Sequence, residues 1–184
     1  MTSEEKRLIA DCRVMIIGTS DFIDYVKAEL YRSGFKSINS GFRSINIVSG
    51  NDVHTGIGPV DMVAEYAGEA CTHVKGNVAI PIIYPFDFVD GAGAIVVMPG
   101  DDNELHDKAN ARLWTAGYMA GYCAFWNMEV CDWLQSALPA IREGKMSETA
   151  QRTAAHICAR IASNIAVDRE VKHFPRFYLC KNLE

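Results

Sequence analysis

The chain is short, balanced in composition and weakly acidic. It has 184 residues, of which 49% are hydrophobic and 22% charged, a balance that excludes intrinsic disorder and can supply one substantial core. The formal net charge of −5 argues against general binding of nucleic acid or anionic membranes, because both need a basic surface. We therefore expect one folded domain over residues 1–184, with neither nucleic acid nor membrane as a partner.

The N-terminal sequence predicts a cytoplasmic protein. Residues 1–7 are polar and mixed in charge, which is unlike a signal peptide. The longest uncharged stretch, residues 113–128, is shorter than the roughly 20 residues of a bilayer span. We interpret that stretch as a buried helix.

The first hundred residues alternate between strand and helix patterns. The apolar run at residues 13–18 predicts a buried strand, and from Asp21 apolar residues recur at helical spacing until Gly34. Further strand patterns follow at residues 37–40, 44–48, 61–66, 79–84 and 91–98, with a short helix or turn at 69–75. This alternation predicts an α/β fold with a mainly parallel sheet.

Beyond residue 100 the pattern is mainly helical. Asp101 or Asp102 can cap a helix that begins near Asn103, and Ser147 can cap the last helix. A terminal strand is predicted at residues 174–179. The whole chain thus predicts a Rossmann-like three-layer αβα fold, with a mixed, mainly parallel sheet and a helical C-terminal part.

One helical segment carries small residues at four-residue spacing. They are Ala116-Gly117, Ala120-Gly121 and Ala124, with bulky neighbours at Trp114, Tyr118, Tyr122, Phe125 and Trp126. Small residues let another backbone approach closely. The line of small residues is either internal core or a surface for close packing with a partner, and the sequence leaves both interpretations open.

The order of these segments resembles a known family. Residues 80–84 (IPIIY) and 91–100 (GAGAIVVMPG) are similar to the "IPxxY/G" strand and the "GxxGxVxVxxPG" hairpin strand of the ubiquitin-activating-enzyme-like family of ThiF, MoeB and HesA. Residues 14–18, 33–38 and 61–63 add supporting pieces, so the resemblance covers most of the chain. It implies binding of ATP and Mg²⁺ and adenylation of the C-terminal carboxylate of a small ubiquitin-like or sulfur-carrier protein.

The resemblance implies a phosphate-binding turn after the first strand, and here the chain departs from the pattern. The six positions of G-x-G-x-x-G fall on residues 18–23, where only Gly18 is a glycine. Gly18, Thr19 and Ser20 remain the candidates for contacting a nucleotide. Asp21 puts a negative charge where a phosphate would lie. Alternatively, Ser20 or Asp21 is simply the N-cap of the following helix.

The other ATP-handling positions that the resemblance implies are altered too. The ribose-binding acid falls near Phe42 and Ser44, and neither residue has a carboxylate. Arg43 is the candidate clamp for the triphosphate, or else a solvated loop residue. The metal-binding aspartate falls on Gly68, with Glu65 and Glu69 as nearby carboxylates. We therefore expect an ATP–Mg²⁺ site that is largely lost.

Cysteines and other acidic residues add only weak candidates. The six cysteines, Cys12, Cys71, Cys123, Cys131, Cys158 and Cys180, contain no Cys-x-x-Cys pair, so no metal site is predicted. Cys123 or Cys131 could form a thioester, but no adjacent cation lowers a thiol pKa and an inert role is favoured. Asp87 and Asp90 could face a ligand from a loop at residues 85–90, although a solvated turn is favoured.

Three functions stay open. The leading hypothesis is a degenerate ThiF/MoeB-like subunit that binds a partner as a homo- or hetero-dimer. The second is an active adenylyltransferase acting on a small ubiquitin-like or sulfur-carrier protein. The third is a binder of another nucleotide-like cofactor, such as a flavin, a dinucleotide or a methyl donor.

Overall fold

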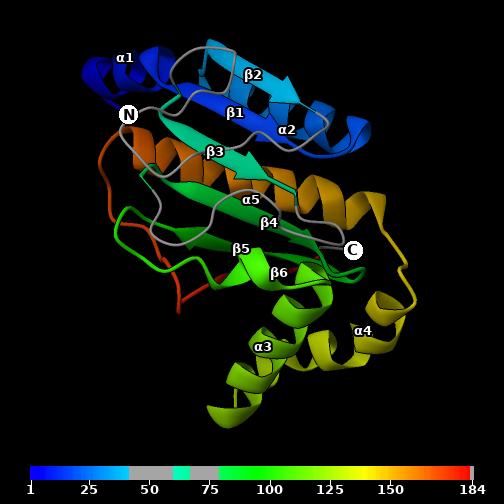
Figure 1. Ribbon diagram of the computed structural model, residues 1–184. Coiled ribbons are helices and arrows are strands. Elements are labelled where there is room, and N and C mark those ends of the chain that lie inside the picture. The colour runs from blue at the N-terminus through cyan, green and yellow to red at the C-terminus, as the bar shows by residue number, and fades with distance from the viewer. Residues whose placement is uncertain (42–59, 67–78, 183–184) are drawn as a thin grey trace.

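A six-stranded mixed sheet forms the centre of the computed structural model, which describes residues 1–41, 60–66 and 79–182 (Figure 1). The strands are β1 (Arg13–Ile17), β2 (Ser37–Gly41), β3 (Met62–Glu65), β4 (Ile82–Asp87), β5 (Gly91–Val97) and β6 (Tyr178–Lys181), in the order β2-β1-β3-β4-β5-β6. β1 to β4 are parallel, and β5 is antiparallel to both of its neighbours. The predicted mixed, mainly parallel sheet is confirmed.

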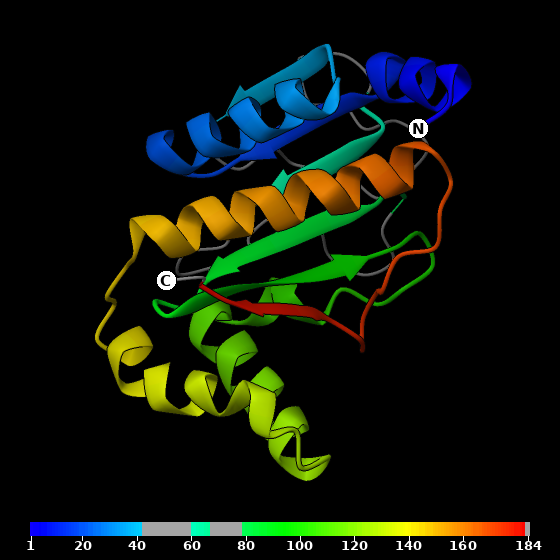
Figure 2. The ribbon, with the colours of Figure 1, turned by 180° about the vertical axis from the view of Figure 1, so that it is seen from behind.

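Helices lie on both faces of the sheet, so the fold is a Rossmann-like three-layer one (Figures 1 and 2). One face carries α1 (Ser3–Asp11), α2 (Ser20–Ser33) and α5 (Glu148–Ala166). The other carries α3 (Ala111–Phe125) and α4 (Asp132–Arg142), with the short 3₁₀ helices η1 (Glu104–Asp107) before α3 and η2 (Glu129–Cys131) between α3 and α4. None of the described helices has both the length and the apolar character needed to cross a bilayer.

The apolar strand runs explain why the sheet lies in the middle. In β1, Val14 and Ile16 face the core under α2 and α5, whereas Met15 and Ile17 face the opposite core. All four are buried. Side chains that alternate between two covered faces require an almost continuous apolar strand.

Most helix ends follow local sequence signals, with two corrections. Gly34 ends α2 in a left-handed conformation (φ 104°), and the Ser147 hydroxyl accepts a hydrogen bond from Ala150 N to cap α5, as predicted. The N-cap of α2 is Thr19, so the prediction of Ser20 or Asp21 is wrong. The helix predicted near residue 103 is only the short η1, and α3 begins after Asn110, whose side chain accepts from Leu113 N.

Two further boundaries differ from the prediction. β4 continues through Pro85 and Asp87, so the predicted loop at residues 85–90 shrinks to a turn after Asp87. The last strand is β6, at residues 178–181, and not 174–179. The predicted strand at residues 44–48 and the helix or turn at 69–75 lie outside the described residues.

Candidate functional site

The carboxyl ends of β1 and β3 form the place where parallel α/β sheets usually bind ligands. The chain leaves β1 toward β2 on one side, while β3 lies on the other side of β1, so the strand order reverses here. Ligands bind at such switch points because the loops diverge and leave a crevice. Gly18 follows β1, and Tyr66 follows β3 and donates its backbone N–H to Ile17 O at 2.8 Å.

Two aromatic side chains fill the space beside Gly18. Phe22 and Tyr66 stack with ring centroids 4.2 Å apart and an interplanar angle of 23°, and they are 0% and 6% exposed. A Cβ added to Gly18 would lie 3.0 Å from Tyr66 Cβ and 3.4 Å from Phe22 Cδ1. The glycine is therefore needed here for close packing against Tyr66, in the position where the family pattern uses it for approach to a phosphate.

The predicted nucleotide contacts come together only in part. Gly18 and Glu65 reach the same edge of the sheet, because Glu65 is in register with Ile17, and Glu65 is buried. Thr19 is exposed and makes no side-chain cap bond. Ser20 begins α2. Arg43 and Glu69 lie outside the described residues.

The described residues at this edge do not fit an ATP–Mg²⁺ site. A triphosphate needs open backbone N–H groups beside the glycine, and the Phe22–Tyr66 stack occupies that space. Within the described ranges no three His, Cys, Asp or Glu side chains are grouped as a metal site requires. The only described member of the expected carboxylate pair, Glu65, is enclosed by protein.

A buried ion pair lies nearby, at the end of β4, and sequence reasoning did not find it. Arg112 Nε donates to Asp87 O at 2.5 Å, and an Arg112 terminal nitrogen lies 3.5 Å from Asp87 Oδ1. The backbone N–H groups of Val89 and Ser147 donate to the two carboxylate oxygens, at 2.6 and 2.7 Å. Arg112 also donates to Lys145 O at 2.5 Å. The pair ties β4, α3 and the α4–α5 connection together.

This pair corrects the interpretation of Asp87. The residue belongs to a buried strand, with none of its surface exposed, and it does not face a ligand from a loop. Both carboxylate oxygens have partners, as a buried charge requires. Its neighbour in sequence, Asp90, does lie in an exposed turn. The only sequence signal for the pair was the isolated Arg112 before 16 uncharged residues.

Burial holds one tyrosine and two cysteines around the sheet in their neutral forms. Burial, followed by the charge of Asp87, raises the pKa of Tyr66, and its hydroxyl donates to Met146 Sδ at 3.7 Å. Burial raises the pKa of the Cys123 thiol to about 12, with hydrogen bonding to Cys131 adding to the effect. Burial alone raises the pKa of Cys158 to about 12. A thiol of this kind is a poor nucleophile, which supports the inert interpretation of Cys123.

The small residues of α3 divide between core and surface. Ala116 and Ala120 are buried against the sheet. Gly117 and Gly121 are exposed, and a Cβ built on either would meet no atom within 4 Å. Of the two interpretations of this segment, core holds for the alanines, while the glycines lie on an uncovered helix surface.

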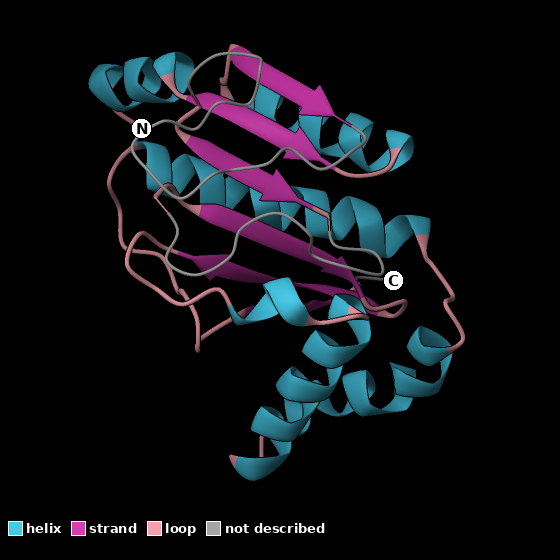
Figure 3. Ribbon diagram, in the orientation of Figure 1, coloured by secondary structure: helices cyan, strands magenta, loops and turns pink. Residues whose placement is uncertain are grey.

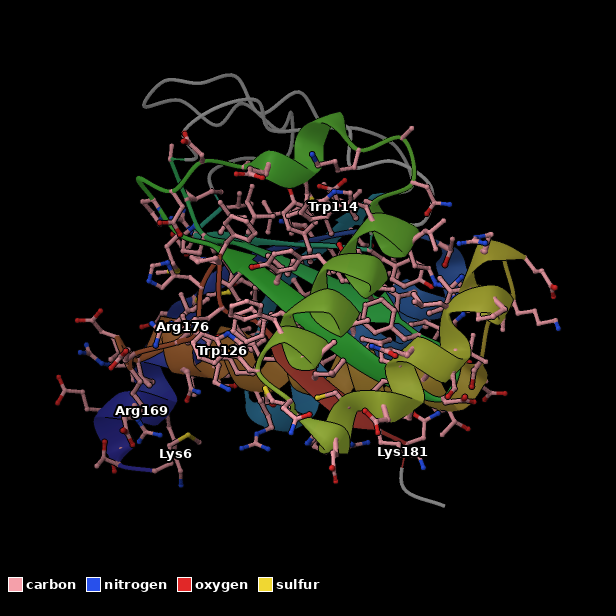
Figure 4. The ribbon with its side chains drawn as sticks, turned by 90° about the horizontal axis from the view of Figure 1, so that it is seen from below. Lys6, Trp114, Trp126, Arg169, Arg176 and Lys181 are labelled. Carbon is pink, nitrogen blue, oxygen red and sulfur yellow. The ribbon has the colours of Figure 1, made fainter. Side chains whose placement is uncertain are left out.

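Aromatic side chains border these glycines. Trp114 stacks on Tyr118, and Tyr118 and Tyr122 pack against Phe177. Farther along, Trp126 (labelled in Figure 4) is 61% exposed and Phe125 is 79% exposed. Their rings lie edge to face, with centroids 5.2 Å apart. We call the exposed set the α3 face; it consists of Gly117, Gly121, Tyr122, Ala124, Phe125, Trp126 and Met128. The expected buried helix at 113–128 is thus buried on one side only.

Comparison of the chain with models of protein families, with curated proteins and with solved structures gave no match. The family resemblance therefore rests on the order of its motifs. The geometry of the site must carry the functional argument.

Proposed function

We propose that the chain is a ThiF/MoeB-like protein that keeps the ubiquitin-activating-enzyme type of fold, has lost most of the ATP–Mg²⁺ site, and acts by binding a protein partner. The observation that carries this proposal is the Phe22–Tyr66 stack against Gly18. Its role is that of a non-catalytic, or at most weakly catalytic, half of a homo- or hetero-dimer.

A nucleotide at this turn would have to displace the Phe22 and Tyr66 rings. Fully burying a large apolar side chain contributes about 1.5–3 kcal/mol, so moving both rings aside removes several kcal/mol of folding free energy. Asp21, in the first turn of α2, adds a carboxylate near the position of the phosphates. ATP must overcome both costs at a turn with a single glycine.

The exposed surface of α3 favours binding of a protein partner. The α3 face is apolar, exposed and continuous, which in a folded protein is characteristic of an interaction surface. The antiparallel β4–β5 hairpin agrees with the motif on which the resemblance rests. These features favour partner binding over turnover.

Thermal unfolding with millimolar ATP and Mg²⁺ tests the nucleotide part of the proposal. A ligand present at 100 times its Kd stabilises the native state by about 2.7 kcal/mol, which shifts Tm by several degrees in a chain of this size. We expect no shift. We also expect no ATP–pyrophosphate exchange when a small protein ending in Gly-Gly is supplied.

A matched variant shows where any effect arises. Thr19→Glu places a carboxylate at the mouth of the turn, and it costs little stability because Thr19 is exposed and acidic groups suit a helix N-terminus. A saturable rise in Tm that Thr19→Glu abolishes would establish nucleotide binding at this turn and contradict the proposal. If a flavin or dinucleotide co-purifies with the wild-type chain but not with Thr19→Glu, the turn binds that cofactor, and the proposal is contradicted.

A further inference from the structure

We infer that the α3 face pairs with the same face of a second copy of this chain, with the two α3 helices antiparallel and crossing at Gly117 and Gly121. This inference deepens the proposed function by naming its partner. It uses no residue of the Gly18 turn.

The first step is the distribution of residues around α3. Positions 117 and 121 are four apart and lie on one side of the helix, about 100° around the axis from the buried Ala116 and Ala120. With no atom within 4 Å of either glycine Cβ, a helix backbone can come close there. Residues 113–128 carry no charge, so a second helix can cover this face without burying an ion.

The second step is the size of the uncovered area. Tyr122, Phe125 and Trp126 are 39%, 79% and 61% exposed. Aromatic side chains can bury about 150–250 Å² each, so these three residues leave roughly 300–400 Å² uncovered. Such an area is comparable to the largest apolar patch of a typical monomer, about 300–600 Å², and patches of this size are often functional. Counted on both copies, with the glycines, Ala124 and Met128 added, it approaches the roughly 1,000 Å² of a specific interface.

The third step is that the face complements itself. In a two-fold interface the same patch serves both copies, so whatever lies before the centre of α3 meets whatever lies after it. A crossing centred between Gly117 and Gly121 puts the bulky, half-buried Trp114 of one copy, which borders the α3 face, opposite the small Ala124 of the other. The large side chain of one copy therefore fits the space beside the small residue of the other copy.

Charge selects the antiparallel direction. Lys108, whose Nζ lies 4.7 Å from the centre of the Trp114 ring, precedes α3, and Glu129 follows it. Met119 is the middle residue of the crossing, 11 residues after Lys108 and 10 before Glu129. An antiparallel pair brings Lys108 of each copy to Glu129 of the other, whereas a parallel pair would place like charges together.

The shape of the molecule leaves this approach open. Both α3 and α4 extend away from the β4–β5–β6 edge of the sheet (Figures 2 and 3). The C-terminal end of α3 lies away from the described strands (Figure 1). A second copy can therefore reach it.

Sedimentation velocity of the full chain from about 1 to 100 µM tests the inference. We expect the mass to rise from 20.3 kDa toward twice that value as concentration increases. Gly121→Glu should weaken self-association at least about tenfold by blocking the close approach and burying a charge. Ala28→Glu, a matched change at an exposed position of α2, should leave self-association unchanged.

Charge reversal tests the direction of pairing without altering the glycines. Lys108→Glu and Glu129→Lys should each weaken the dimer by about three- to tenfold, and the double variant should recover most of the loss. Circular dichroism confirms that each variant is folded. A chain that stays at 20.3 kDa at 100 µM overturns the inference. So does a dimer that Gly121→Glu leaves intact, or a double reversal that recovers nothing.

These outcomes separate the inference from the proposed function. If the chain is monomeric and ATP does not bind, the second copy is not the partner, but the proposed loss of the nucleotide site is still supported. If the chain dimerises through the α3 face and also binds ATP, pairing with a second copy is supported and the proposed loss of the nucleotide site is contradicted.

Discussion

Two aromatic clusters of similar composition have opposite settings in this molecule. Phe22 and Tyr66 are buried and stack at the switch point of the sheet, where a parallel α/β protein usually holds a ligand. Phe125 and Trp126 form a second pair at the end of α3, with ring centroids 5.2 Å apart, and most of their surface is exposed. The first cluster fills the position where such folds usually bind a ligand. The second exposes aromatic rings that proteins usually bury.

The difference in exposure indicates that the buried pair stabilises the fold and that the exposed pair serves in recognition. Side chains that fill a core contribute free energy by leaving water and packing closely, and their loss is costly. Exposed rings contribute almost nothing to the isolated fold and become useful only when something covers them. The following predictions test this contrast.

The largest effect is expected at the buried stack. Phe22→Ala should lower the free energy of unfolding by about 3–5 kcal/mol, because it leaves a cavity between α2 and the sheet. Phe125→Ala, the matched change on the α3 face, should alter it by less than about 0.5 kcal/mol. Urea unfolding below 1 µM, where self-association is negligible, measures both. Comparable losses in the two variants would show that the clusters do not differ as described.

A similar contrast holds for ion pairs. Arg112→Ala should cost about 3–5 kcal/mol, because it leaves the buried Asp87 carboxylate without its cation. Arg152→Ala removes a partner of Glu148 on the exposed side of α5 and should cost less than about 1 kcal/mol. Urea unfolding at pH 7 compares the two. A loss below 1 kcal/mol for Arg112→Ala would show that the Asp87 pair is not the structural tie that its contacts indicate.

The thiols provide the smallest effect. Burial raises the pKa of Cys12 to about 11 and that of Cys158 to about 12, so the folded chain keeps both thiols protonated well above the pH at which unfolded thiols ionise. At pH 8, iodoacetamide should modify the exposed Cys180 at least about tenfold faster than Cys158. Mass spectrometry of the digested chain measures each site.

The raised pKa of the Cys158 thiol also makes the stability of the fold depend on pH. An unfolded thiol begins to lose its proton near its ordinary pKa of 9.0, whereas the folded Cys158 thiol keeps its proton up to about 12. The unfolded state therefore binds fewer protons in this range, and the free energy of unfolding falls as pH rises from 9 toward 12. Cys158→Ala should flatten that fall. An unchanged slope, or modification of Cys158 as fast as Cys180, would show that the thiol is accessible in the folded chain.

Local sequence signals predicted much of the fold. The apolar run before Gly18, the helical spacing after Asp21 and the Ser147 cap each depend on neighbours in sequence, and the structure confirms all three. Boundaries failed where tertiary pairing overrides a local signal. Proline usually interrupts a strand, yet β4 continues through Pro85 because the pairing of β4 with β5 continues there, with Pro85 opposite Ala94.

The candidate site was less predictable, because it depends on contacts between distant residues. The missing glycines after Gly18 are visible in the sequence, but the stack of Phe22 on Tyr66 joins residues 44 positions apart. Arg112 and Asp87 likewise meet only after β4 and α3 have packed. Each side of the contact looks ordinary in sequence, and no local pattern identifies the partner.

The most direct test of the central claim is a ¹H–¹⁵N spectrum of the chain titrated with ATP and Mg²⁺ to 5 mM and, separately, diluted from about 200 to 10 µM. The account predicts that the amides of Gly18 and Thr19 do not move with ATP, while the Trp126 indole signal shifts on dilution as the α3 face is uncovered. Saturable shifts of Gly18 and Thr19 with ATP, and a Trp126 signal that is independent of concentration, would contradict it.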